Sequence, residues 1–294
     1  MGEGIGLAVI GGSGFYDMPG LEDAVDVRVA TPFGDPSDAI RVGKIGGVPV
    51  AFLARHGRHH SLLPSELPQR ANFWALKSLG VKRVVAVSAV GSLREEYAPG
   101  DCVIPDQLID RTRGARPATF FGDGIVAHVS MAEPFCPALS ESAQAAAIAV
   151  GAACHRGGSY VVIEGPAFGT RAESELYRSW GIGVVGMTAL PEAKLAREAE
   201  LCYSIISTVT DYDSWRADHR AVDAATIFRV LRANVAMGQS IVATLAGTLG
   251  PADCSCHHSL DAALVTSAAA IPPATRTRLE PILARRLATE EAPV

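Results

Sequence analysis

The sequence predicts an α/β fold: a single domain with a mixed or mainly parallel central sheet flanked by helices. Short runs rich in β-branched residues alternate with helical patterns almost to the end of the chain, as in α/β domains. Several runs are apolar at every position, as expected for strands buried on both faces of a sheet. With 294 residues, the chain is long enough to bury a substantial core.

Each expected element is a segment whose apolar pattern fits its type. The expected strands, in chain order, are Leu7–Gly12, Val48–Ala54, Arg83–Val90, Cys102–Pro105, Tyr160–Glu164, Val184–Met187 and Cys202–Thr210. The expected helices are Pro68–Leu79, Ala138–Ala153, Arg171–Trp180, Glu192–Glu200 and Ala224–Leu245. No repeat or linker interrupts residues 1–249, so we expect one domain there. Residues 250–294, which contain "CSCHH" and an Ala- and Pro-rich tail, should add a helical extension packed on it.

Composition and charge exclude several classes of protein. Hydrophobic residues make up 48% of the chain and charged residues 19%, and the mean hydropathy is +0.21. No run has the ~18 uninterrupted apolar residues of a membrane span, so the apolar excess favours oligomer interfaces. The net charge is −5 and the basic residues are scattered, which argues against a nucleic-acid partner.

The N-terminal sequence and the cysteines indicate a cytoplasmic protein. "MGEGIG" lacks the basic region of a signal peptide, and Gly6 stands where a myristoylation motif needs Ser or Thr. We expect Cys102, Cys136, Cys154 and Cys202 to be small core residues in a reducing compartment.

Polar clusters follow most of the expected strands, and their shared position predicts one ligand site. In open α/β sheets, ligands bind beyond the carboxyl ends of the strands. The clusters are Gly11–Gly14, Arg55–His60, Ser88–Ser92, Gly165–Thr170, Thr188 and Asp211–Asp213.

The first cluster, "GGSG", offers backbone N–H groups and a hydroxyl to an anion. Asp17 stands where the dinucleotide fingerprint needs its third glycine, and no G-x-x-x-x-G-K-[ST] loop is present. A cradle for a small anion is therefore favoured, with a plain structural turn and a nucleotide cofactor site as alternatives.

The second cluster, "LARHGRHH", adds groups that suit a phosphate. The planar fork of Arg55 matches phosphate oxygens, and His56 can add a donor. Ser88, with adjacent backbone donors, and Thr188 could complete the set. An exposed basic surface and a metal site at His56 and His60 remain alternatives.

The tail motif "CSCHH" raises the question of a second metal site. Cys254, Cys256, His257 and His258 could ligate zinc or form a strained disulfide, but one C-x-C is too short for a usual zinc knuckle. We expect an ordinary exposed turn and no metal.

Taken together, several motifs in order resemble one family. They are "GGSG", "TPFGDPSDAIRVGKI", "LARHGRHH", "VSAVGSLREEYAPGD", "MAEPFCP", "IEGPAFGTRAES", "GMTALPEAKLAREAELCYS" and "VTDYDSW". From about residue 7 to 245, the chain resembles the methylthioadenosine phosphorylases of the trimeric purine nucleoside phosphorylase family. The resemblance implies a homotrimer that needs no cofactor, with inorganic phosphate as co-substrate.

The resemblance also assigns roles to residues. Phosphate would be held by Ser13, Arg55, His56, Ser88, the backbone of Ala89, and Thr188. The nucleoside would contact Phe168, Met187, His60, Ala224, Ile227 and, from a neighbouring subunit, His128. Asp211 and Asp213 would read the base edge and supply catalysis.

The chemistry of these residue types fits phosphorolysis. A phosphate would attack C1′ of the ribosyl group, while an acid protonates N7 of the departing purine. Asp211, if desolvated beside Asp213, could be that acid. Carboxylates beside the base favour adenine, and Gly169 stands where 6-oxopurine phosphorylases carry Glu. Against this, the animal methylthioadenosine enzymes carry Arg and Asn where Ala167 and Gly186 stand here. A phosphorylase for 6-oxopurine nucleosides or methylthioinosine, a nucleotide-dependent enzyme and a non-catalytic purine-binding protein remain alternatives.

Overall fold

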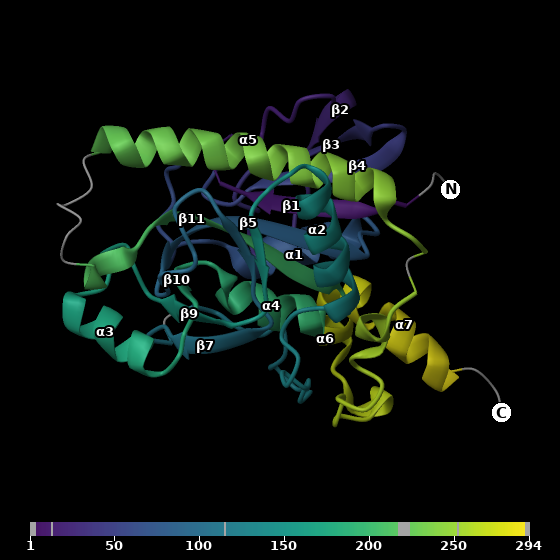
Figure 1. The fold of residues 1–294 in the computed structure, drawn as a ribbon. Helices are drawn as coiled ribbons and strands as arrows, with labels where there is room; N and C mark the ends of the chain where they lie inside the picture. Colours follow the sequence, from purple (N-terminus) through teal and green to yellow (C-terminus); the bar gives the residue numbers. More distant parts are fainter. Residues whose placement is uncertain (1–3, 13, 115, 217–223, 252, 292–294) are drawn as a thin grey trace.

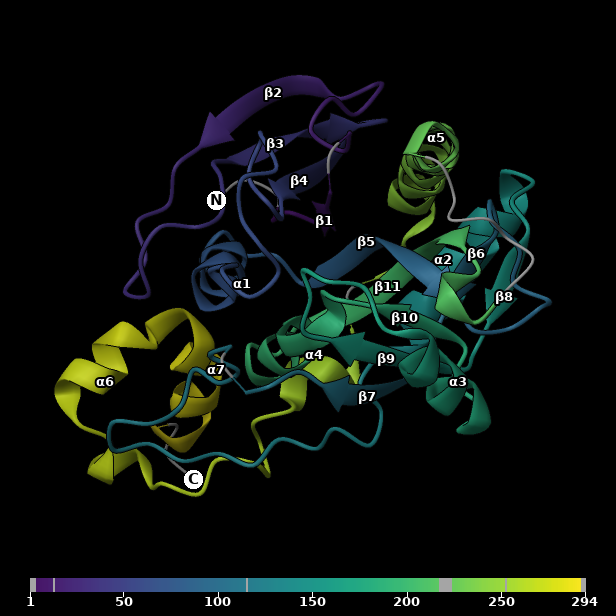
Figure 2. The same ribbon diagram turned by 90° about the vertical axis from the view of Figure 1, so that its left-hand side faces the viewer.

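The central sheet of this computed structural model has helices on both of its faces (Figures 1 and 2). The structure describes residues 4–12, 14–114, 116–216, 224–251 and 253–291. Its strands are β1 (Leu7–Gly11), β2 (Glu22–Val27), β3 (Ile40–Ile45), β4 (Val48–Ala54), β5 (Arg83–Ser92), β6 (Cys102–Ile104), β7 (Gln107–Arg111), β8 (Cys154–Arg156), β9 (Ser159–Ile163), β10 (Val184–Gly186) and β11 (Cys202–Asp211). Its α-helices are α1 (Gln69–Ser78), α2 (Pro137–Ala149), α3 (Arg171–Ser179), α4 (Ala189–Glu198), α5 (Ala224–Thr248), α6 (Pro273–Arg278) and α7 (Glu280–Glu291).

The sheet is mixed, and it branches at β5. One path runs in the order β2-β3-β4-β1-β5-β10-β9-β7, while β11 pairs with β5 and continues to β6 and β8. β5 is parallel to β1 and β11 but antiparallel to β10, which joins only its last residues. The predicted mixed sheet is therefore confirmed.

Successive side chains of the central strands point to opposite faces of the sheet and pack into two separate apolar cores. In β1, Ala8 and Ile10 join a cluster with residues of α1, α4 and α7, whereas Leu7 and Val9 join a cluster with residues of α2 and α5. Both faces are thus covered, which explains why the strand is apolar throughout.

All seven expected strands and all five expected helices are present, with ends shifted by a few residues. Four strands were not expected, namely β2, β3, β7 and β8. β2, "EDAVDV", is almost wholly exposed and lies at the edge of the sheet, and β8 has three residues. Backbone pairing rather than apolar burial defines such strands, so the residue pattern does not reveal them.

The C-terminal extension forms α6 and α7, as the tail composition predicts. Leu279, Ile282 and Leu283 are buried in the same cluster as Phe73 of α1. Within the described residues, none of the helices combines the length and apolarity that crossing a membrane would require.

Candidate active site

The predicted polar clusters meet at one cavity of about 1090 Å³. Because β1, β4, β5 and β11 run parallel, the residues that follow them share one edge of the sheet. β10 runs the opposite way and brings Thr188 back to β5. The lining residues from the predicted clusters include Gly12, Arg55, His56, Ser88, Ala89, Phe168, Thr188, Asp211 and Asp213.

One end of the cavity presents hydroxyl groups. Ser88 Oγ lies 3.1 Å from Thr188 Oγ1, and both residues are buried. The hydroxyl of Tyr160 is buried with no hydrogen-bond partner among the described residues, and burial raises its pKa. The Ser88 and Thr188 hydroxyls line the cavity together with Ala89 and can donate to an anion.

Arg55 lies at the same end, but most of its donors are already used. Its Nε lies 2.6 Å from Glu192 Oε1, its Nη1 donates to Val87 O, and its Nη2 donates to Ile10 O. The side chain is 2% exposed. Nη1 keeps one hydrogen for an anion, so Arg55 contributes mainly a fixed positive charge.

Glu192 is the group that holds Arg55, and the sequence reasoning missed it. Its carboxyl is wholly buried and also accepts a hydrogen bond from the Tyr203 hydroxyl at 2.8 Å. A signal was present: a carboxylate among apolar residues in the first turn of a buried helix usually has a cationic partner.

The nitrogen of His56 left for a ligand, Nε2, can only accept in the neutral ring, whereas the sequence analysis proposed His56 as a donor. Its Nδ1 donates to Leu62 O at 2.8 Å, and burial, together with the charge of Arg55, lowers its pKa to about 4. The neutral ring therefore presents the lone pair of Nε2, which suits a phosphate oxygen that carries a proton. His60 stacks on His56, with ring centroids 4.4 Å apart, and lines the cavity.

The two aspartates line another part of the cavity, where β11 ends. Burial, and then the charge of Asp213, raise the pKa of Asp211 to about 6. Burial also raises the pKa of Asp213, whose Oδ2 accepts a hydrogen bond from Ser174 at 2.6 Å. The expected raised pKa of Asp211 is therefore present, with desolvation as its main cause.

Glycine makes room for this pair. A Cβ on Gly91 would lie 3.1 Å from Asp213 Cβ and 3.2 Å from Asp211 Oδ1.

A second glycine, Gly186, makes room for Tyr160. A Cβ on Gly186 would lie 1.9 Å from the Tyr160 hydroxyl. Tyr160 thus fills the space that any larger residue at position 186 would need.

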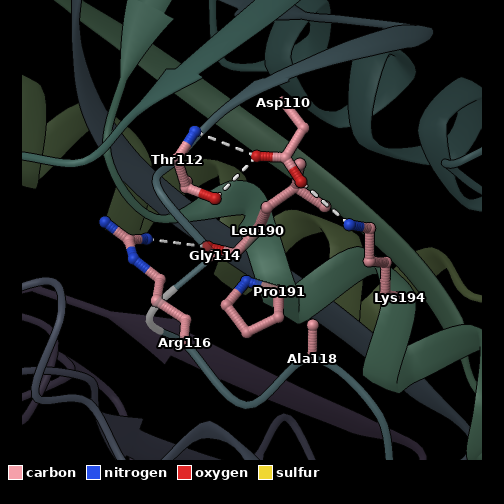
Figure 3. A pocket seen from close by; sticks show the side chains of 8 residues that line it. All are labelled: Asp110, Thr112, Gly114, Arg116, Ala118, Leu190, Pro191 and Lys194. Carbon is pink, nitrogen blue, oxygen red and sulfur yellow. Dashed lines mark hydrogen bonds and ion pairs between the residues drawn. The ribbon is translucent and has the colours of Figure 1, made fainter.

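Met187 lines the cavity and is positioned by Arg116, a residue that the sequence reasoning missed. Arg116 Nη1 donates to Met187 O at 2.6 Å and to Leu190 O at 2.8 Å, and its Nε pairs with Glu164. Arg116 also lines a smaller cavity of about 150 Å³, together with Leu190 and Pro191 (Figure 3). A lone Arg in a loop carries no sequence signal for such a role.

The remaining predicted contacts have different outcomes. Phe168 lines the cavity with 81% of its surface exposed, which leaves its ring available to a ligand. Ser13 and the side chains of Ala224 and Ile227 lie outside the described residues. His128 is exposed, and its backbone N–H donates to Ala263 O. Its predicted contact is with a neighbouring subunit, so that role stays a prediction.

Comparison with known proteins identifies relatives of this chain. The family model described as "Phosphorylase superfamily" matches residues 7–246. An S-methyl-5'-thioadenosine phosphorylase from Chloroflexus aurantiacus is 55% identical over 280 residues, which cover 95% of this chain and 97% of the relative. A methylthioadenosine phosphorylase from an antarctic soil metagenomic library has a solved structure that superposes with a TM-score of 0.92. It is 46% identical, and the match covers 96% of this chain and 100% of that one. The methylthioadenosine phosphorylase of Schistosoma mansoni, solved with adenine, has a TM-score of 0.79 at 37% identity over 85% of this chain and 93% of its own.

Proposed function

The chain belongs to the phosphorylase superfamily, and on that premise we propose that it cleaves 5′-methylthioadenosine with inorganic phosphate. The products are adenine and 5-methylthioribose 1-phosphate, so the enzyme is a pentosyltransferase of methionine and purine salvage. It uses phosphate as a co-substrate and needs no organic cofactor. The proposal rests on one cavity lined by two kinds of group. The first is the buried hydroxyls of Ser88 and Thr188 near Arg55, and the second is the carboxyl of Asp211, whose pKa is raised to about 6.

In this reaction, the bond between C1′ and purine N9 breaks as a phosphate oxygen bonds to C1′. The sugar carries positive charge in the transition state, and the phosphate beside it supplies the counter-charge. Ser88, Thr188 and the fixed guanidinium of Arg55 position that phosphate. Asp211 gives its proton to purine N7, and N9 keeps the electron pair of the broken bond, so the purine leaves as a neutral base.

A carboxyl at position 211 also selects the base. The 6-amino group of adenine can donate to the carbonyl oxygen of the protonated carboxyl while the O–H of that carboxyl points at N7, whereas O6 of hypoxanthine would face the carbonyl oxygen as a second acceptor. Gly169 offers no side chain for N1–H of a 6-oxopurine, unlike the Glu of the 6-oxopurine phosphorylases. A 6-oxopurine nucleoside or methylthioinosine phosphorylase is therefore the second candidate.

One assay tests the proposal. Purified protein is incubated with methylthioadenosine, adenosine, inosine and methylthioinosine, with and without phosphate, and the released base is identified. We expect adenine from methylthioadenosine only when phosphate is present. Equal release without phosphate would identify a hydrolase, and faster release of hypoxanthine would favour the second candidate.

We further propose that the enzyme is a cytoplasmic homotrimer whose cavities are completed by neighbouring subunits. The segment of His128 pairs with residues 263–265 and exposes Val126 and Val265, with 47% and 66% of their surfaces accessible. Exposed apolar residues beside a polar side chain suit a subunit contact. All six cysteines are free thiols, which fits a reducing compartment.

Subunit mixing tests this assembly. Asp211→Ala and His128→Ala chains are unfolded, mixed and refolded together, and trimers are isolated by size. Mixed trimers contain borders where an intact Asp211 meets an intact His128, so we expect more activity than the two parents supply together. Mixed trimers without this gain would place the whole cavity in one chain.

A further inference from the structure

Four cysteines from three separate parts of the chain meet in one cluster. Cys136 is the residue before α2, Cys202 begins β11, and Cys254 and Cys256 belong to the C-terminal extension. Their four Sγ atoms all lie within 4.8 Å of one another, and Cys136 Sγ is 3.7 Å from Cys254 Sγ. Cys136, Cys202 and Cys256 are buried, and Cys254 is half-buried. The prediction that the C-x-C motif forms an exposed turn is thus wrong, because this turn packs against the core.

We propose that these four thiols bind one zinc ion. A tetrahedron of sulfur atoms around zinc at about 2.3 Å has edges of about 3.8 Å; the Cys136–Cys254 separation of 3.7 Å matches this edge, and no pair of the four is farther apart than 4.8 Å. Four sulfur ligands in tetrahedral geometry are typical of structural zinc. The spacing suits a single ion, since all four Sγ atoms can approach one centre together.

The surroundings of the cluster supply the hydrogen bonds and the charge that such a site needs. The backbone N–H of Leu139, in the first turn of α2, donates to Cys136 Sγ at 3.5 Å. Arg197 Nη1 donates to Cys256 Sγ at 3.5 Å. Four thiolates around Zn²⁺ leave two negative charges in excess, which Arg197 and the positive end of α2 offset.

His257 is not a ligand; it donates a hydrogen bond that orients the sulfur of Cys202. Its Nε2 lies 3.2 Å from Lys82 O and 3.5 Å from Cys202 Sγ. Because a carbonyl only accepts, Nε2 carries the hydrogen and donates it to both neighbours. The first His of "CSCHH", His257, would therefore support a cysteine ligand without binding the metal itself.

The site is structural and remote from catalysis. All four coordination positions are filled by protein, which leaves none open for a substrate. Cys202 begins β11 and Asp211 ends it, so the cluster and the acid lie at opposite ends of one ten-residue strand, about 30 Å apart. The zinc would fasten the start of the C-terminal extension to α2 and β11.

Metal analysis of the intact enzyme tests the proposal without relying on any variant. The protein is purified without added chelator, and its metals are measured by mass spectrometry. Titration with an organomercurial should release about one zinc per chain as four thiols react. After exchange, Co²⁺ should give the visible absorption of a tetrahedral thiolate complex.

Variants locate the site. Cys254→Ser and Cys256→Ser should lose the zinc and lower the temperature of unfolding, whereas the matched control Cys154→Ser should keep both. Cys154 serves as the control because its thiol lies outside the cluster. The zinc content of the wild type decides the question even if a variant fails to fold.

Two results would overturn the zinc assignment. The first is protein without stoichiometric zinc, whether denaturation without a reductant then exposes all six thiols or only two, the second case showing two disulfides. The second is one equivalent of iron in place of zinc. Either result leaves the phosphorolysis assay unaffected, so this inference fails independently of the proposed function.

Discussion

Replacement of Asp211 by Asn removes the proposed acid while keeping the shape of the side chain. In the wild type, burial and the neighbouring Asp213 raise the pKa of Asp211 to about 6, so part of the enzyme carries the proton near neutral pH. An amide cannot deliver that proton to purine N7. Loss of a positioned general acid costs about 10²- to 10⁴-fold in rate, which corresponds to about 3–5 kcal/mol of transition-state stabilisation.

The pH dependence of the wild type follows from the same group. Asp211 must be protonated to act, so kcat for methylthioadenosine should decline about tenfold for each pH unit well above the pKa. Asp211→Asn should lose this descending limb and keep only the low residual rate. Asp35→Asn is a suitable control, since Asp35 is exposed and does not line the cavity.

The base preference gives a second readout of the same variant. An amide at position 211 can donate to O6, so the ratio of kcat/KM for methylthioadenosine to that for methylthioinosine should fall. The assay follows adenine and hypoxanthine release at saturating phosphate over a range of pH. An unchanged rate, a retained pH limb or an unchanged base ratio would show that protonation and base selection reside elsewhere.

Two further predictions concern stability. Burial raises the pKa of Glu198 from its usual 4.5 to about 7, so the folded state binds this proton more tightly and becomes less stable as pH rises between these values. Glu198→Gln should raise the free energy of unfolding by up to about 3 kcal/mol near pH 8 and change little near pH 4. Denaturant titration at both pH values measures this, and an equal effect at both would refute it. Gly186→Ala would place Cβ 1.9 Å from the Tyr160 hydroxyl and should cost about 1–3 kcal/mol. Adding Tyr160→Phe should recover part of the loss in thermal unfolding, and a Gly186→Ala protein as stable as the wild type would contradict the clash.

Much of the fold could be predicted from local patterns. The seven expected strands are buried on both faces, and their apolar runs identify them because the chemical signal lies within each segment. β2 and β8 escaped prediction because their stability comes from pairing with a neighbour, which residue types do not encode.

The sequence by itself also determined the membership of the site. Polar residues placed after parallel strands must meet at one edge of the sheet, so Arg55, Ser88 and Asp211 could be assigned to one cavity. The position of each residue after a strand determined that they lie together, and the residue types indicated phosphate and acid chemistry.

Only the tertiary structure decided how these groups are held. Glu192 uses up most of the donors of Arg55, Leu62 makes His56 an acceptor, and Arg116 ties down Met187. The cysteine cluster is the clearest case, since Cys136 and Cys254 are 118 residues apart in the chain. Hydrogen-bond direction, desolvation and metal geometry depend on distances across the fold, and the order of residues along a chain does not contain those distances.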